Sequence, residues 1–370
     1  MGAVVPLLPV YAKNLGATGL YIGFVFGAFS LSRTILLPVF GRLSDKYGRK
    51  PFIVFGLLIY SLISLCFVFA KTVESIIIIR FVHGFSSAMI MPVVQAYAGD
   101  ITPKGKEGIS MGTFNISIFF GLSAGPILGG IVNSYYGMNA AFLGMSGLVF
   151  IGFLLAYFML PPVSAEKKRG EAKLTKWRKI ITDKDVAGLF IFRFVYTSCI
   201  GIIWSFMPIF AGDNFAVSSA YIGLLVAIGV FISGLMHIPM GYVADRVSKT
   251  KLITIGGLIT GLSVLLIERS GSLNDIIIAS VLFGVGGGIS TPGVMSLSVI
   301  KGKQKKAMGT VMALLTMAHS LGMFVGSVGA GIMMDIFNLR YAFFFGTVLM
   351  TVGTIAFAIL AKDPSGKDEI

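Results

Sequence analysis

Residues 41–51 read GRLSDKYGRKP, and they place one acid and four bases in a chain of which only 12% of residues are charged. Long apolar runs stand on both sides of this stretch. Charge between two apolar runs predicts a turn at a membrane surface rather than part of a soluble core. The same pattern recurs along the chain, so we interpret the stretch as one loop of a series.

The composition is that of a membrane protein. Hydrophobic residues make up 55% of the 370 residues, and the mean hydropathy is +0.89. A soluble globular domain has about 45–50% apolar and about 25% charged residues. The apolar runs are about 20 residues long, which is the length that a helix needs to cross a hydrocarbon core. The alternation typical of membrane strands is absent, so we predict an all-α integral membrane protein.

Charges, Gly and Pro divide the chain into twelve predicted helical spans. They cover residues 1–12, 19–41, 51–70, 74–98, 108–132, 139–160, 187–211, 219–244, 251–267, 273–299, 306–332 and 340–361. A long polar stretch, residues 164–185, separates six spans from six. We therefore predict an N-terminal six-helix bundle over 1–160, a basic cytoplasmic linker over 161–186, and a C-terminal six-helix bundle with a short tail over 187–370.

Basic residues gather on one side of the predicted membrane. If the loops alternate sides, most of the 30 Lys and Arg residues fall near 42–50, 100–107, 164–185, 246–251 and 301–306 and in the C-terminal tail. The positive-inside rule places that side, with both termini of the complete protein, in the cytoplasm. This asymmetry accounts for the net charge of +14 without a nucleic-acid partner. We predict a multi-pass protein of the cytoplasmic membrane of the cell.

The two sets of spans carry an internal repeat. At a spacing of 200 residues the same residue recurs in these pairs: Tyr21 and Tyr221, Gly41 and Gly241, Asp45 and Asp245, Gly84 and Gly284, Pro92 and Pro292. Six spans followed by six related spans in the same orientation predict a parallel duplication, as in transporters whose halves are related by an axis along the membrane normal. The repeat also predicts a first helix of about half the usual length, so we expect N-terminal residues to be missing from the sequence.

The loop at 41–50 resembles a motif of the major facilitator superfamily, G-x-L-a-D-r-x-G-r-r/k, through Gly41, Leu43, Asp45, Gly48, Arg49 and Lys50. The resemblance implies a transporter of two six-helix bundles in which this loop is a conformational switch that stabilises the outward-facing form. Physically, Asp45 is placed to pair with Arg49 and to accept hydrogen bonds at a neighbouring helix N-terminus. The copy at Asp245 lacks the turn glycine, which weakens its case as a switch.

The fifth predicted span, GTFNISIFFGLSAGPILGG, carries Gly112, Gly121, Gly125, Pro126, Gly129 and Gly130. Three of these glycines recur every fourth residue and form a face where another helix can approach closely, and the proline removes a backbone hydrogen bond. An ordinary small-residue packing face is the simpler interpretation. The whole spacing is similar to the motif associated with antiporters of the same superfamily, which implies an exporter.

The fourth span contains RFVHGFSSA, which resembles R-x-x-q-G-x-g-a-a with His83 in place of Gln. The resemblance implies that Arg80 takes part in proton coupling. Arg80 lies about 9 Å inside its span, so its long side chain is also placed to reach the outer interface. His83 lies deeper, where an ionisable group is costly and usually faces a cavity. Arg80 and His83 are the proton-coupling candidates, with helix packing as the alternative.

Buried polar and aromatic residues indicate a substrate cavity. Tyr196 and Trp204 lie eight residues apart on one face of the seventh span, which lines the cavity in the family that the chain resembles. Asn115 and Arg193 are further candidates, with helix contacts as the simpler explanation. No signature of an enzyme, a nucleotide site or a metal site is present, so we expect no catalytic activity, cofactor or metal.

We predict a proton-coupled secondary exporter of small hydrophobic or cationic compounds that works by alternating access. Its partners would be a small-molecule substrate, protons and the lipid bilayer, and we expect a monomer. One alternative is a symporter or carrier of sugars or organic anions, in which Arg80 and Arg193 would bind a carboxylate. An alternative of another class is a membrane sensor, which would bind a ligand without moving it.

Overall fold

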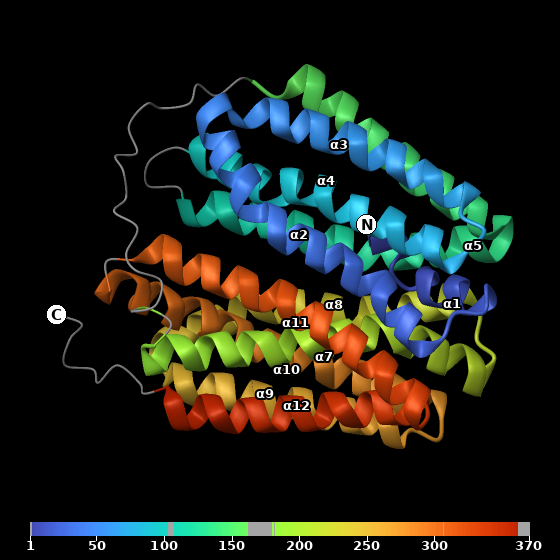
Figure 1. The fold of residues 1–370 in the computed structure, drawn as a ribbon. Helices are drawn as coiled ribbons and strands as arrows, with labels where there is room; N and C mark the ends of the chain where they lie inside the picture. Colours follow the sequence, from blue (N-terminus) through green and yellow to red (C-terminus); the bar gives the residue numbers. More distant parts are fainter. Residues whose placement is uncertain (1, 103–106, 162–179, 181, 306, 362–370) are drawn as a thin grey trace. The chain divides into compact units, whose positions relative to one another are not determined.

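The computed structural model describes residues 2–102, 107–161, 180, 182–305 and 307–361, and all regular elements within these ranges are helical (Figure 1). The predicted all-α class is therefore confirmed. Most of the predicted linker at 161–186 lies outside the described residues.

The elements of the first half are η1 (Gly2–Val4), α1 (Leu7–Asn14), α2 (Gly19–Tyr47), α3 (Arg49–Cys66), η2 (Phe67–Phe69), α4 (Val73–Asp100) and α5 (Glu107–Met159). Those of the second half are α7 (Lys184–Phe215), α8 (Ser219–Arg246), α9 (Lys249–Arg269), α10 (Leu273–Gln304), α11 (Met308–Ile336) and α12 (Leu339–Leu360). Polar side chains begin several of these helices. At α10, for example, Ser272 and Asp275 form a capping box that pairs N–H groups left free at a helix start.

Ten helices in the described part of the chain are long and apolar enough to cross a membrane. The difference from twelve predicted spans has two local causes. The spans predicted at 108–132 and 139–160 belong to one element, α5, which is interrupted at Gly137 with φ +82°, a conformation that glycine adopts readily. The first predicted span contains a 3-10 turn and the eight-residue α1, which is too short to cross.

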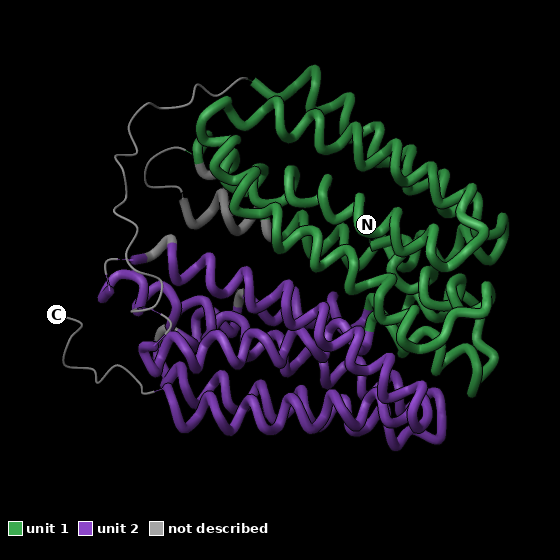
Figure 2. The backbone as a smooth tube through the Cα atoms, in the orientation of Figure 1, with its two compact units in different colours: residues 1–169, 204–227 green, residues 170–203, 228–370 purple. Residues whose placement is uncertain are grey.

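The chain forms two compact units (Figure 2). Unit 1 contains residues 1–169 and 204–227, and unit 2 contains residues 170–203 and 228–370. The end of α7 and the start of α8 therefore belong to unit 1. The division into bundles over 1–160 and 187–370 stays a prediction.

Glycines allow close helix packing in unit 1, where α4 packs against both α2 and α3. Gly84 on α4 faces the backbone of Phe29 on α2, and a Cβ there would overlap the Phe29 carbonyl oxygen. Gly56 on α3 faces the side chains of Met89 and Ile90 on α4, and a Cβ there would lie 2.8 Å from Ile90 Cγ1. Helices α2 and α3 therefore pack on the middle of α4, where its polar residues lie.

Unit 2 has a corresponding core in which α9 packs against α10 and α12. Gly256 on α9 faces the Gly286 carbonyl oxygen on α10, at 2.6 Å from the position of a Cβ. Phe343 and Phe357 of α12 are fully buried. These contacts position the buried residues of α7 and α10 that are described below.

The outward-facing side chains of both units are apolar. Phe120 and Phe158 of α5 and Ile359 of α12 are 73%, 75% and 74% exposed. Aromatic and aliphatic side chains at such exposure are unfavourable in water and favourable in hydrocarbon. The helix surfaces are therefore suited to contact with lipid.

Candidate functional site

The predicted switch loop joins α2 to α3 through Gly48. This residue has φ +93°, which a residue with a Cβ rarely adopts, so the turn requires glycine. Directly after the turn, Arg49 Nη1 lies 2.6 Å from Asp45 Oδ1. Gly41 lies one turn before Asp45, and a Cβ at Gly41 would meet no described atom within 4 Å. The loop geometry thus depends on Gly48, whereas Gly41 is not required by packing.

Arg49 also binds a residue that the sequence did not indicate. Its Nε donates a hydrogen bond to Asp100 Oδ2 at 2.9 Å, and its Nη1 donates to Ser44 Oγ at 3.0 Å. The Arg49 side chain is only 12% exposed. Because Asp100 is the last residue of α4, one guanidinium group connects the ends of α2 and α4 at the start of α3.

The corresponding turn in the second half is built differently. Asp245 lies one residue before the end of α8, and its side chain is outside the described residues. Ser248 begins α9 and accepts a hydrogen bond from the Lys251 N–H at 3.1 Å. The guanidinium carbon of Arg246 lies 3.9 Å from the ring centroid of Tyr242. A serine cap therefore stands where Gly48 stands in the first half.

The glycine face of α5 packs against the start of the chain. A Cβ at Gly125 would lie 2.9 Å from the Ala3 N atom, and a Cβ at Gly129 would overlap the Ala3 carbonyl oxygen. At Gly121 a Cβ would meet no described atom within 4 Å. The repeated glycines are thus required for packing at two of these three positions.

The other residues of this motif contact the start of α8 within unit 1. A Cβ at Gly130 would overlap the Ser219 carbonyl oxygen, and the Pro126 carbonyl oxygen faces Gly223. Asn133 Nδ2 donates a hydrogen bond to Ser219 Oγ at 2.8 Å. The surroundings of Gly112 and Asn115 lie outside the described residues. The motif therefore forms a close contact surface for two segments of unit 1.

Arg80 points into unit 1 rather than to a surface, and it is 3% exposed. Its Nε donates a hydrogen bond to the Val25 carbonyl oxygen at 2.9 Å. Its guanidinium carbon lies 4.5 Å from the ring centroid of Phe29 and 5.3 Å from that of Phe26. These three contacts hold Arg80 against α2, and they rule out the extended arrangement that would take it to an interface.

His83 lies one turn along α4 and is 1% exposed. Its ring stacks on Tyr60 of α3 with centroids 4.1 Å apart, and its Nε2 lies 3.1 Å from Ser64 Oγ. The Ser64 hydroxyl donates to the Tyr60 carbonyl oxygen at 2.7 Å, so Nε2–H of His83 is the donor to Ser64. Tyr60 and Ser64 were not identified from the sequence, because one aromatic and one hydroxyl residue in an apolar span give no distinctive signal.

The cavity candidates of α7 fall in different units. In unit 2, Arg193 Nη2 lies 3.2 Å from His319 Nδ1 of α11, and Tyr196 stacks on Phe283 of α10 with centroids 5.9 Å apart. Trp204 belongs to unit 1. Tyr196 is 7% exposed. The structure thus places Arg193 and Tyr196 within the helix contacts of unit 2.

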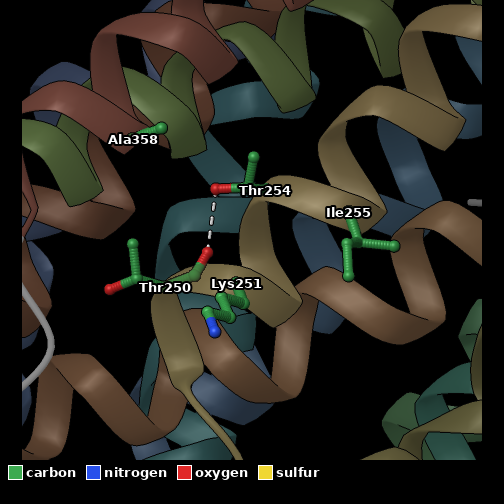
Figure 3. A pocket seen from close by; sticks show the side chains of 5 residues that line it. All are labelled: Thr250, Lys251, Thr254, Ile255 and Ala358. Carbon is green, nitrogen blue, oxygen red and sulfur yellow. Dashed lines mark hydrogen bonds between the residues drawn. The ribbon is translucent and has the colours of Figure 1, made fainter.

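A pocket of about 310 Å³ opens on unit 2 and contains none of the predicted site residues (Figure 3). Thr250, Lys251, Thr254, Ile255 and Ala358 line it, from the start of α9 and the end of α12. The Thr254 hydroxyl donates to the Thr250 carbonyl oxygen at 2.8 Å, so that hydroxyl is already used within α9. Within the described residues, no group of three or more His, Cys, Asp or Glu is placed to hold a metal ion.

Two ion pairs connect the start of α7 to the end of α10 in unit 2. Lys301 Nζ lies 2.7 Å from Asp185 Oδ2, and Lys305 pairs with Asp183. Partial burial would raise the pKa of Asp183, but hydrogen bonds from Lys305 and from the Val186 N–H, with the Lys305 and Lys301 charges, bring it below its ordinary value. This basic end of α10 is thus held to α7 by charge.

These observations define a polytopic α-helical membrane protein with a charged loop between α2 and α3 and buried cationic side chains in its helices. The family model described as Major Facilitator Superfamily matches residues 1–212 and 189–369, so the chain belongs to that superfamily. It is a multi-pass membrane transporter and not an enzyme.

Relatives with similar sequences extend over nearly the whole chain. An uncharacterised transporter of the same superfamily from Methanocaldococcus jannaschii is 29% identical, covering 96% of this chain and 93% of the relative. Multidrug resistance protein 1 of Bacillus subtilis is 27% identical, covering 99% of this chain and 93% of the relative. The crystal structure of the nucleoside transporter NupG has a TM-score of 0.82 at 14% identity, covering 98% and 96% of the two chains, which shows a shared fold.

Proposed function

We propose that this transporter exports small lipophilic molecules in exchange for protons, by alternating access. The observation that carries the proposal is the burial of His83 beside Arg80 in the middle of unit 1. Every acidic residue of the described helices lies within two residues of a helix end. No carboxylate within the described interior therefore competes with His83 for a transported proton.

The arrangement on α4 supports coupling between charge movement and protonation. Arg80 and His83 are three residues apart and share a helix face. Arg80 is held by Val25, Phe26 and Phe29 of α2, so a shift of α2 relative to α4 would move its charge. A change in the distance of that charge changes the proton affinity of the imidazole. In this proposal His83 carries the proton and Arg80 controls its release.

The switch loop supports alternating access. Asp45, Arg49 and Asp100 hold the ends of three helices together by ion pairs of 2.6 and 2.9 Å. Partly exposed ion pairs contribute only about 0–1 kcal/mol, so they can break and re-form during a transport cycle. We propose that they stabilise one conformation of the cycle, with the basic loops and both termini in the cytoplasm and the protein acting as a monomer.

Export and a lipophilic substrate are supported by the antiporter-like spacing on α5 and by the name of the Bacillus subtilis relative. The sequence predicted hydrophobic or cationic substrates, and the charges inside the described helices favour the first of these two classes. A buried organic cation needs a counter-charge, and the described helix interiors hold arginines and histidines but no acid. We therefore favour lipophilic substrates without a positive charge over cationic ones.

Everted membrane vesicles test this proposal. Vesicles with the transporter should accumulate the neutral dye N-phenylnaphthylamine when respiration generates a proton gradient, and a protonophore should abolish the accumulation. Vesicles prepared from cells without the transporter are the control for passive uptake, and ethidium is the cationic comparison. Accumulation that is indifferent to the protonophore would contradict proton coupling.

Counterflow in proteoliposomes separates a transporter from a membrane sensor. Vesicles preloaded with unlabelled dye should take up labelled dye transiently above its external concentration if the protein exchanges it across the bilayer. A protein that only binds its ligand would show saturable binding without this overshoot, and that result would support the sensor.

A further inference from the structure

The interior of unit 1 holds two arginines and, within the described helices, no carboxylate. Arg33 lies at the centre of α2, and Arg80 lies in the first half of α4. The acids of these helices, Asp45, Glu74 and Asp100, are all at helix ends. Burying a charge without an opposite charge is unfavourable, because the low-dielectric interior replaces its hydration poorly. The two arginines therefore call for negative charge from another source.

The surrounding protein compensates the two arginines unequally. Arg80 has the Val25 carbonyl oxygen and the faces of Phe26 and Phe29. Arg33 Nε is buried and has no hydrogen-bond partner among the described residues. A guanidinium N–H can only donate, so this atom requires an acceptor. The positive charge of Arg33 is thus less well compensated by the surrounding protein than that of Arg80.

On the three packed helices α2, α3 and α4, Ser32 Oγ, Tyr60 Oη and His83 Nδ1 are likewise buried and lack hydrogen-bond partners within the described structure. Their side chains are almost completely buried, at 0%, 5% and 1% exposure. Buried polar atoms without a partner are rare in native proteins. Hydroxyl groups of Ser and Tyr can both donate, and His83 Nδ1 also donates when the imidazole is protonated.

The packing of α2, α3 and α4 brings these residues together. His83 stacks on Tyr60, and Ser32 packs against Gly84, the residue that follows His83. Arg33 follows Ser32 on α2, and Arg80 lies three residues, about one turn, before His83 on α4. We call Ser32, Arg33, Tyr60, Arg80 and His83 the Arg33 cluster. It combines two positive charges with several unused donors.

We propose that the Arg33 cluster binds one anionic group, either a free halide ion or the carboxylate of a transported molecule. Both are acceptors without a proton to donate, which matches the unpartnered donors of Ser32, Arg33 and Tyr60. A cation would be repelled by both arginines, and a neutral molecule would leave their charge uncompensated. The carboxylate case rests on the proposed transport function, whereas the halide case is independent of it.

Thermal unfolding of the purified full-length transporter in detergent tests the proposal. Sodium gluconate, whose anion carries five hydroxyl groups and is strongly hydrated, sets the reference at constant ionic strength. Replacing it with sodium chloride, sodium bromide or sodium benzoate should raise the unfolding midpoint saturably, by about 2–4 °C. A rise with the halides alone identifies a free ion. A rise with benzoate but not with benzamide or benzylamine identifies a carboxylate.

Substitutions locate the effect. Arg33→Gln should remove the shift, and so should Tyr60→Phe, which deletes one hydroxyl and preserves the ring stacked on His83. Arg42→Gln, an exposed arginine on the same helix, should retain it. The proposal is overturned if no anion exceeds gluconate, or if the shift persists in Tyr60→Phe and Arg33→Gln. Because the titration involves no transport, a transporter without proton coupling would give the same result.

Discussion

Arg49 Nε lies 2.9 Å from Asp100 Oδ2, and this hydrogen bond joins the start of α3 to the end of α4. The same guanidinium lies 2.6 Å from Asp45, at the end of α2. Arg49 is therefore shared by two carboxylates on two helices, and a shared partner couples the effects of changing either one. The proposed switch therefore consists of three residues, of which sequence motifs indicate only two.

Neutralising either carboxylate should impair transport more than binding. For Asp45→Asn and Asp100→Asn we expect net dye transport in everted vesicles to fall about tenfold, which corresponds to about 1.4 kcal/mol in the barrier. Equilibrium dye binding should stay unchanged, because neither residue lies in the buried interior. Lys46→Gln, an exposed change in the same loop, is the control. Equal losses in all three variants would contradict a specific role for the carboxylates.

Two glycines of α5 give a matched test of the packing. Gly129→Ala should reduce the free energy of unfolding by about 1–3 kcal/mol, because the added methyl group would overlap the Ala3 carbonyl oxygen. The loss would be measured as a lower unfolding midpoint in detergent. Gly121→Ala should be neutral or slightly stabilising, since its methyl group meets no described atom and alanine favours helix. A similar loss at both positions would show that the space around them does not decide the effect.

The Asp183–Lys305 pair predicts a pH-dependent contribution to stability. The pKa of Asp183 is lower in the folded protein than in the unfolded chain. The stabilisation from its ionised carboxylate is therefore fully present above the unfolded pKa of about 3.9, and it is lost as the pH falls through the folded-state pKa. Asp183→Asn should therefore be less stable than the original protein at neutral pH, and the difference should shrink below about pH 4. Unfolding midpoints between pH 3 and pH 7 measure this. A constant difference across that range would exclude the ion pair as its cause.

Lys13 and Asp213 form an ion pair in unit 1, and they are separated by 200 residues, the spacing of the internal repeat. Their side chains are 37% and 46% exposed, so the pair adds at most about 1 kcal/mol to stability. We expect Lys13→Asp and Asp213→Lys each to reduce net dye transport, because each places like charges together. The double exchange should restore transport by restoring opposite charges. If the double variant is as impaired as the single ones, the pairing is not what matters.

The sequence predicted the features that depend on local pattern. Apolar run length predicted the helices, and the repeat with the loop motif predicted the superfamily that the family model confirms. Gly48 was recognisable as a turn residue because the motif places it between two apolar runs. The break at Gly137 was anticipated as a boundary between spans, and non-helical backbone angles separate the two helical stretches of α5 at that residue.

The polar contacts between α3 and α4 could not be predicted in the same way. Tyr60, Ser64 and His83 are brought together by the packing of separate helices, and the sequence carries no signal of which helix faces touch. Asp100 was missed for a similar reason, since its partner is 51 residues away. Long-range polar contacts in an apolar chain depend on tertiary structure rather than on local pattern.

The central claim, that substrate and protons move in exchange and that His83 carries the proton, is tested most directly in proteoliposomes containing the pH-sensitive dye pyranine. An outward gradient of N-phenylnaphthylamine should drive proton entry, recorded as acidification of the lumen. His83→Gln, which keeps a polar side chain but cannot be protonated, should abolish the acidification while dye binding remains. Acidification that is unchanged in His83→Gln, or dye efflux without any proton entry in the original protein, would contradict the account.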